Sequence, residues 1–267
     1  MSEFGRGLHK SYIKIDHLKK YYHLLKKNLY QKRVALRGHM GYGKFIIICR
    51  SRTGSSLLKS LLDHHPEIAC SGEIFKTLQG KDTHTVWNQF FNKKPKNIKQ
   101  VGCKIFYYHP LDGGTEVWDL IERDSEIKII HLIRKNRLSA LVSQKIGEKT
   151  KLWSENVDRP HGLNLDEKRI SLDFEECKNT FQKISNYEEH TRRAFSNHPY
   201  TEIYYENLAE DPISTAYELY EFLGLSKKEV VVKNKKQNPE KLSELIMNYE
   251  DLKQQFLGTP WEVHFEN

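Results

Sequence analysis

The side chains best suited to bind an anion are concentrated between an apolar run, Phe45–Cys49, and a helical pattern that begins at Ser55. The segment and the start of the helix supply two guanidinium groups, one glycine and four hydroxyl groups: Arg50, Ser51, Arg52, Thr53, Gly54, Ser55 and Ser56. A strand that leads through such a loop into a helix presents backbone N–H groups and the positive end of the helix dipole to an anion. The pattern predicts a phosphate site; its alternative is an ordinary turn with a Ser or Thr at the helix N-cap.

The segment is not a Walker A loop, because the order GxxxxGK[ST] is absent from it. A superficially similar stretch, Gly38–Lys44, precedes the apolar run. Its Lys44 is therefore at the wrong end of the predicted strand to reach a phosphate in the loop. A nucleotide phosphotransferase that needs a Walker lysine and a magnesium-binding aspartate is accordingly disfavoured.

A second candidate anion site follows another apolar run. Arg134 comes directly after Ile129–Ile133, and a predicted helix with Ser139 and Ser143 follows it. Ligands of open α/β sheets bind at the carboxyl ends of the strands, and a guanidinium group matches the geometry of a phosphate. Arg134 is therefore a candidate phosphate ligand, although a lone arginine is more often a surface residue.

Alternating strand and helix patterns must position these two segments. The predicted strands are Phe45–Cys49, Val101–Tyr108, Ile127–Ile133 and Thr201–Tyr205, and the predicted helices are Ser55–Asp63, Thr83–Phe91, Thr115–Glu122, Arg137–Ile146, Phe174–Phe195 and a last one from Pro212 to about Leu223. This alternation predicts an α/β fold with a parallel sheet flanked by helices. The polar stretch Thr150–Leu172 is expected to be a loop over the site.

A further helix is predicted near the N-terminus, at about residues 9–31, where apolar residues recur at a helical period between lysines. We expect it to pack onto the main domain rather than to bind a membrane surface, because tyrosines dilute its apolar face. With 267 residues, the chain is expected to form a single domain, 1–267.

The charge of the chain favours an anionic partner. The formal net charge is +8 and the isoelectric point is near 9.1, and nucleic acid, acidic lipid and a phosphorylated ligand all suit such a chain. A basic nucleic-acid-binding protein is therefore a competing class of function, and it would bind duplex with a steep dependence on salt.

The cysteines and the hydropathy indicate a reducing, aqueous environment. The four cysteines, Cys49, Cys70, Cys103 and Cys177, form no CxxC pair and have no histidine at zinc-site spacing, so we expect buried thiols and no metal. No stretch approaches the roughly 18 apolar residues of a membrane span. The N-terminus has no apolar signal core. We expect a cytoplasmic protein.

Together, the two candidate anion sites resemble the 5′-phosphosulfate and 3′-phosphate motifs of sulfotransferases that use 3′-phosphoadenosine 5′-phosphosulfate (PAPS). Arg52–Leu58 followed by Gly72–Phe75 looks most like the bacterial carbohydrate branch, which includes trehalose and nodulation-factor sulfotransferases. Tyr204–Leu208, Asp211-Pro212 and Phe222–Leu225 are similar to the C-terminal pattern of the family. The resemblance, from about Phe45 to Tyr249, implies a P-loop-like sulfotransferase fold and PAPS as co-substrate, without a metal.

The resemblance also implies roles for individual residues. Arg52, Thr53, Gly54, Ser55 and Ser56 would hold the 5′-phosphosulfate. Arg134 and a helix serine would hold the 3′-phosphate, and Ser143 fits the spacing of the branch better than Ser139. A loop from Lys233 to Gln237 would close over the nucleotide, with Lys236 as its phosphate contact.

Sulfuryl transfer requires in-line positioning, stabilisation of charge on the transferred and leaving oxygens, and a base for the acceptor proton. By the resemblance, Glu73 is the base, and His109 is its alternative because histidine is the commonest general base. Arg52 would act electrostatically, since a guanidinium is a poor proton donor. The acceptor is expected to be a hydroxyl or amine of a carbohydrate or small polar metabolite; the oligomeric state stays open.

Overall fold

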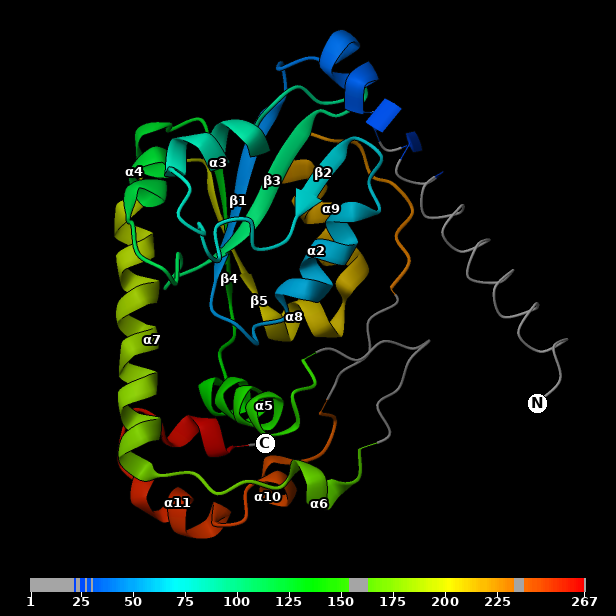
Figure 1. Cartoon of the computed structure of the whole chain (residues 1–267). Helices are drawn as coiled ribbons and strands as arrows, with labels where there is room; N and C mark the ends of the chain where they lie inside the picture. The colour runs from blue at the N-terminus through cyan, green and yellow to red at the C-terminus, as the bar shows by residue number, and fades with distance from the viewer. Residues whose placement is uncertain are drawn as a thin grey trace, which may run out of the picture.

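The fold is built on five parallel strands in the order β2-β3-β1-β4-β5 (Figure 1). The computed structural model describes residues 22, 25–26, 28–29, 31–153, 163–232 and 238–266. The strands are β1 (Gly43–Cys49), β2 (Ile68–Ser71), β3 (Gln100–Phe106), β4 (Lys128–Ile133) and β5 (Tyr200–Tyr204). Every pairing is parallel, which confirms the predicted α/β fold.

β1 lies at the centre of the sheet because both of its faces are apolar. Phe45–Cys49 has no exposed surface, and Ile47 pairs with Lys104 of β3 on one side and with Ile130 of β4 on the other. The chain turns to one side of β1 for β2 and β3 and to the other for β4 and β5. The loops after β1 and β4 are thus neighbours at the carboxyl edge, where such sheets bind ligands.

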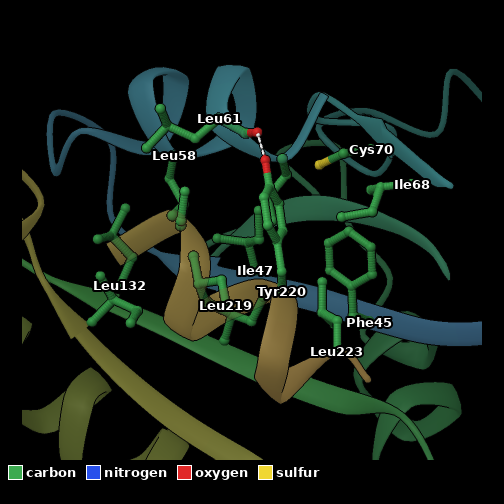
Figure 2. Packing of buried hydrophobic residues seen from close by; sticks show 14 of the residues in the cluster. Phe45, Ile47, Leu58, Leu61, Ile68, Cys70, Leu132, Leu219, Tyr220 and Leu223 are labelled. Carbon is green, nitrogen blue, oxygen red and sulfur yellow. Dashed lines mark hydrogen bonds between the residues drawn. The ribbon is translucent and has the colours of Figure 1, made fainter. Parts of the chain in front are cut away.

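Helices cover both faces of the sheet. One face carries α2 (Ser55–Asp63), α8 (Tyr205–Glu210) and α9 (Pro212–Phe222). The other carries α3 (Thr83–Phe90), α4 (Glu116–Arg123) and the end of α7 (Phe174–Ala194). On the first face Tyr220 is fully buried among leucine and isoleucine side chains, and its hydroxyl donates to the carbonyl of Leu61 at 2.7 Å (Figure 2).

A third apolar cluster packs beyond the carboxyl edge of the sheet, where α7 extends past the strands (Figure 1). Its elements are α5 (Arg137–Thr150), α6 (Leu165–Lys168), the first part of α7, α10 (Leu242–Leu245), α11 (Tyr249–Phe256) and the 3-10 helix η1 (Glu262–Phe265). This cluster places α5 next to the loop that follows β1.

Several predicted boundaries were wrong for local reasons. β2 was not predicted, since it has only four residues. β3 ends at Phe106 rather than Tyr108, because the chain turns there and the N–H of His109 donates to the carbonyl of Phe106 at 2.9 Å. Tyr205 begins α8 instead of ending β5, and the expected loop Thr150–Leu172 contains the short helix α6.

The predicted N-terminal helix lies largely outside the described residues. Helical conformation is described at residues 22, 25–26, 28–29 and 31–37, so the helix continues beyond residue 31. Tyr22, Leu25 and Leu29 are exposed, which differs from the expected packing onto the domain. Within the described part of the chain, none of the helices has the length and apolarity to cross a membrane.

Candidate active site

The loop between β1 and α2 forms the floor of the site. Gly54 is the N-cap residue of α2 and has a φ of 84°, a backbone conformation that favours glycine. A Cβ atom there would lie 2.4 Å from Cδ2 of Tyr205, so the ring of Tyr205 covers the loop. The hydroxyl of Thr53 donates to the carbonyl of Arg50 at 2.7 Å, which fixes the turn.

The N-terminus of α2 is electrostatically open to an anion. No side chain caps it, and its first turn has no acidic residue. No side chain therefore neutralises the partial positive charge that the first N–H groups of the helix carry. Ser55 is buried in this turn and Ser56 is exposed. The alternative of a Ser or Thr N-cap was wrong for this helix, because glycine occupies that position.

Arg52 points from the loop towards α5. Its Nε and Nη2 atoms donate to Oγ of Ser143 at 3.0 and 2.8 Å, and Nη1 donates to the carbonyl of Trp153. Arg52 has a φ of 65°, in the left-handed region of the backbone. Burial lowers the pKa of Arg52, and the neighbouring guanidinium of Arg134 lowers it further.

Arg134 joins the second predicted motif to the first. Its Nη1 atom donates to the carbonyl oxygen of Arg52 at 3.1 Å, and its guanidinium lies 4.4 Å from the centre of the Tyr205 ring. Burial lowers the pKa of Arg134. The structure therefore brings Gly54 and Arg134 against the ring of Tyr205, and Arg52 contacts both Arg134 and Ser143.

Hydrogen bonds to Glu206 and to the first turn of α5 fix the segment between Arg134 and α5. The carboxylate of Glu206 accepts from the N–H groups of Lys135 and Asn136, at 3.2 Å in each case. The side chain of Asn136 accepts from the N–H of Ser139 at 2.8 Å and so caps α5. Ser139 thus lies at the capped end of the helix, whereas Ser143, one turn further on, contacts Arg52.

Glu73 and Lys104 form an ion pair on the other side of the loop. Their Oε1 and Nζ atoms are 3.1 Å apart, with side chains 23% and 10% exposed. Lys104 Nζ is also 3.4 Å from Oγ of Ser55, so this pair borders the start of α2. Lys104 was not among the predicted site residues. Its signal was a single cation inside the apolar run of β3, whose facing direction sequence alone did not determine.

His109 is buried in the turn after β3. Its Nδ1 atom accepts from the N–H of Phe106 at 3.2 Å, and its carbonyl accepts from the indole of Trp118 at 2.8 Å. Burial lowers the pKa of His109 to about 4. Because Nδ1 is the acceptor, the ring proton of the neutral imidazole is on Nε2.

Two predicted features lie away from this constellation or beyond the described residues. Lys236 is outside the described residues; the nearby Asn238 is described, and its Nδ2 atom is 3.4 Å from Oγ of Ser143. Lys44 of the Walker-like stretch pairs with Asp124 at 2.6 Å, at the amino edge of the sheet. The placement of Lys44 agrees with the prediction that it cannot serve the loop.

Arg50 was recognised only as part of the basic loop. Its Nη2 atom donates to the side-chain oxygen of Gln144 at 2.7 Å, and Gln144 in turn donates to Glu148. Its Nη1 atom is buried and has no hydrogen-bond partner among the described residues. Arg50 thus connects the loop to α5 at Gln144, the residue after Ser143. Its Nη1 atom could donate to a further oxygen atom.

Among the described residues, no group of three or more His, Cys, Asp or Glu side chains could hold a metal ion. The four cysteines are buried and unpaired, as expected.

Comparisons with known proteins show similarity to sulfotransferases. Nodulation protein H of Rhizobium meliloti (strain 1021) is 24% identical over 83% of this chain and 94% of its own length, and Nodulation protein H of Rhizobium tropici is 25% identical over 83% and 92%. A sulfotransferase from Alicyclobacillus acidocaldarius has a similar fold, with a TM-score of 0.50 and 17% identity over 83% of this chain and 93% of that one. The model of the sulfotransferase family matches residues 125–229, which contain β4, Arg134 and α5.

Proposed function

We propose that the chain transfers a sulfuryl group from PAPS to a hydroxyl or amine of a carbohydrate or a small polar metabolite. The observation that carries the proposal is the hydrogen bond of 3.1 Å from Arg134 to the carbonyl of Arg52. It joins the ends of β1 and β4, and this supports the proposal that one adenosine nucleotide binds both residues through its two phosphate ends.

The residues of the site fit such a nucleotide. The uncapped N-terminus of α2 supplies N–H groups for the 5′ end, and its first turn has no carboxylate to repel an anion. Burial lowers the pKa of Arg52, and the neighbouring guanidinium of Arg134 lowers it further, since like charges repel. An anionic ligand between them would remove this cost. The loop Thr53–Ser56 would therefore hold the 5′-phosphosulfate, and Arg134 with Ser143 the 3′-phosphate.

The bound nucleotide would supply the activated sulfuryl group. Arg52 would offset charge on the leaving phosphate oxygen as the sulfur–oxygen bond breaks. Lys104, 3.4 Å from Ser55 and 3.1 Å from Glu73, is placed to offset charge on the transferred oxygens. The new bond forms between sulfur and the acceptor atom, whose proton passes to a base.

Glu73 is the proposed base. Its carboxylate is partly exposed beside Lys104, where an acceptor could reach it. His109 is less suited, because the lone pair on its Nδ1 already accepts from Phe106 and its Nε2 carries the proton. The carbohydrate acceptor rests on the resemblance to the bacterial carbohydrate branch, and the similarity to Nodulation protein H supports that branch.

Calorimetry with adenosine 3′,5′-bisphosphate tests the donor site. We expect the wild-type chain to bind it and Arg134→Ala to weaken binding at least about tenfold, since a charge-assisted bond is lost. Lys135→Ala is the matched control, because Lys135 lies over the ring of Tyr204 and outside the site. No heat with the wild-type protein would overturn the proposal. A screen of sugars and small alcohols and amines with radiolabelled PAPS would then identify the acceptor.

A further inference from the structure

The side chain of Asn238 has one polar atom that nothing in the described part of the chain pairs with. Its Nδ2 atom lies 3.4 Å from Oγ of Ser143, which places the amide beside the proposed 3′-phosphate position. Its Oδ1 atom is buried, and no donor among the described residues reaches it. A buried amide oxygen is costly unless a donor from outside the chain meets it.

Asn238 is positioned by contacts on its carboxyl side. Pro239 follows directly and restricts the backbone of Asn238 to extended conformations. The carboxylate of Glu240 pairs with Nζ of Lys168 at 2.7 Å, and the Lys168 side chain is only 9% exposed. Ile170, two residues after α6, makes two backbone hydrogen bonds of 2.9 and 2.8 Å at the end of α10 (Figure 1). The segment that carries the amide is therefore tied to the packed domain without a ligand.

Ser143 sets which part of a nucleotide would lie next to the amide. Its Oγ atom accepts from two nitrogens of Arg52, so its own proton can be donated to a phosphate oxygen. A 3′-phosphate that accepts this proton would also lie close to Nδ2 of Asn238. The carbon atom of the ribose that bears the 3′-phosphate would then be near the amide as well.

The chemistry of the nucleotide limits the choice of a donor for Oδ1. The phosphate and sulfate oxygens of PAPS are acceptors at neutral pH, and its remaining donors are the ribose 2′-hydroxyl and the 6-amino group of adenine. The 2′-hydroxyl is on the carbon next to the one that bears the 3′-phosphate, whereas the amino group is on the far side of the base. Beside Ser143, the 2′-hydroxyl is therefore the donor within reach of Asn238.

We propose that Oδ1 of Asn238 accepts a hydrogen bond from the 2′-hydroxyl of the nucleotide, and that this contact selects ribonucleotides over 2′-deoxyribonucleotides. A site built to bind a hydroxyl rejects the analogue that lacks it, because the buried partner is then left unpaired. The inference rests on the proposed function, since it takes PAPS as the sulfuryl donor. Asn238 is thus a specificity-determining residue of the donor site and takes no part in the transfer itself.

Isothermal titration calorimetry with adenosine 3′,5′-bisphosphate and 2′-deoxyadenosine 3′,5′-bisphosphate tests the inference. We expect the wild-type chain to bind the deoxy form at least about tenfold more weakly, because the hydrogen bond to a buried oxygen is lost. Asn238→Ala should bind both nucleotides with equal affinity. Asn238→Asp should keep the preference, because its carboxylate still accepts, while its charge weakens the binding of both. Asn186→Ala, at an exposed asparagine of α7, is the matched control and should keep the wild-type preference.

The outcomes separate the inference from the proposed function. Equal binding of the two nucleotides by the wild-type chain would overturn the inference and leave the proposed function intact. A preference that persists in Asn238→Ala would do the same, because another group would then contact the 2′-hydroxyl. If the wild-type chain bound neither nucleotide, the proposed function would fail and the inference with it. Binding of adenosine 3′,5′-bisphosphate by Asn238→Ala also shows that this variant is folded.

Discussion

Arg52 donates from two of its guanidinium nitrogens to the single hydroxyl oxygen of Ser143, at 3.0 and 2.8 Å. The two residues come from the loop after β1 and from α5, 91 positions apart in the chain. This contact places Ser143 in the candidate donor site and gives Arg52 a partner near the proposed 3′-phosphate. The contact also distinguishes the two serines of α5: Ser143 binds Arg52, whereas the N–H of Ser139 donates to the capping residue Asn136.

Ser143→Ala should weaken the binding of adenosine 3′,5′-bisphosphate by about tenfold or more, because a hydrogen bond to a charged group is lost. Ser139→Ala is the matched control on the same helix and should bind normally. Isothermal titration calorimetry of both variants checks the prediction. Weaker binding by the Ser139 variant alone would reverse the assignment.

Gly54→Ala should lower the free energy of unfolding by about 2–4 kcal/mol, because it combines a left-handed backbone with a clash against Tyr205. Gly80 is a control: it also has a positive φ, of 72°, but a Cβ there would have nothing within 4 Å. Gly80→Ala should therefore cost only about 1 kcal/mol. Denaturant unfolding measures both values, and equal losses would argue against the contact with Tyr205.

Glu73→Gln should retain nucleotide binding and reduce turnover by at least about 100-fold, because the proposed base is lost while the size of the side chain is kept. His109→Gln should change turnover much less, since its Nδ1 serves the turn after β3. Once an acceptor is known, steady-state kinetics of both variants decide between them. An active Glu73→Gln enzyme beside an inactive His109→Gln enzyme would make His109 the base.

The protein should lose stability as the pH falls from about 6.5 to about 4. Burial lowers the pKa of His109, His131 and His264 to about 4, from an ordinary value of 6.5. Between these pH values the unfolded chain binds protons that the folded chain does not, so acid favours unfolding and the loss is absent above about pH 6.5. Each histidine contributes up to about 1.4 kcal/mol per pH unit in this window.

His131→Gln isolates one of these contributions. His131 is fully buried, and its ring nitrogens contact the hydroxyls of Tyr107 and Tyr200. The variant should be less stable at neutral pH and show a shallower decline in the free energy of unfolding between pH 6.5 and 4. His84→Gln, at an exposed histidine, should leave the slope unchanged. An equal slope in all three proteins would contradict the prediction.

Local sequence patterns were sufficient to predict the helix and the strands that position the candidate site. The helix Ser55–Asp63 was predicted at its observed bounds, because hydroxyl-rich turns before amphipathic runs are local signals. β1 and β4 were predicted from continuous apolar runs, which indicate strands buried on both faces. The four-residue β2 was missed, since a run that short has no periodicity of its own.

What the sequence by itself determined about this protein was its fold class, the two strand ends that are candidate anion sites and the residue types available there. Only the tertiary structure decided which side chains meet: Arg134 with Arg52 across 82 positions, Ser143 rather than Ser139 with Arg52, and Lys104 with Glu73. The physical reason is that secondary structure follows from neighbours along the chain. Contacts within a site depend instead on strand order, register and packing angles, which are set by the whole core at once.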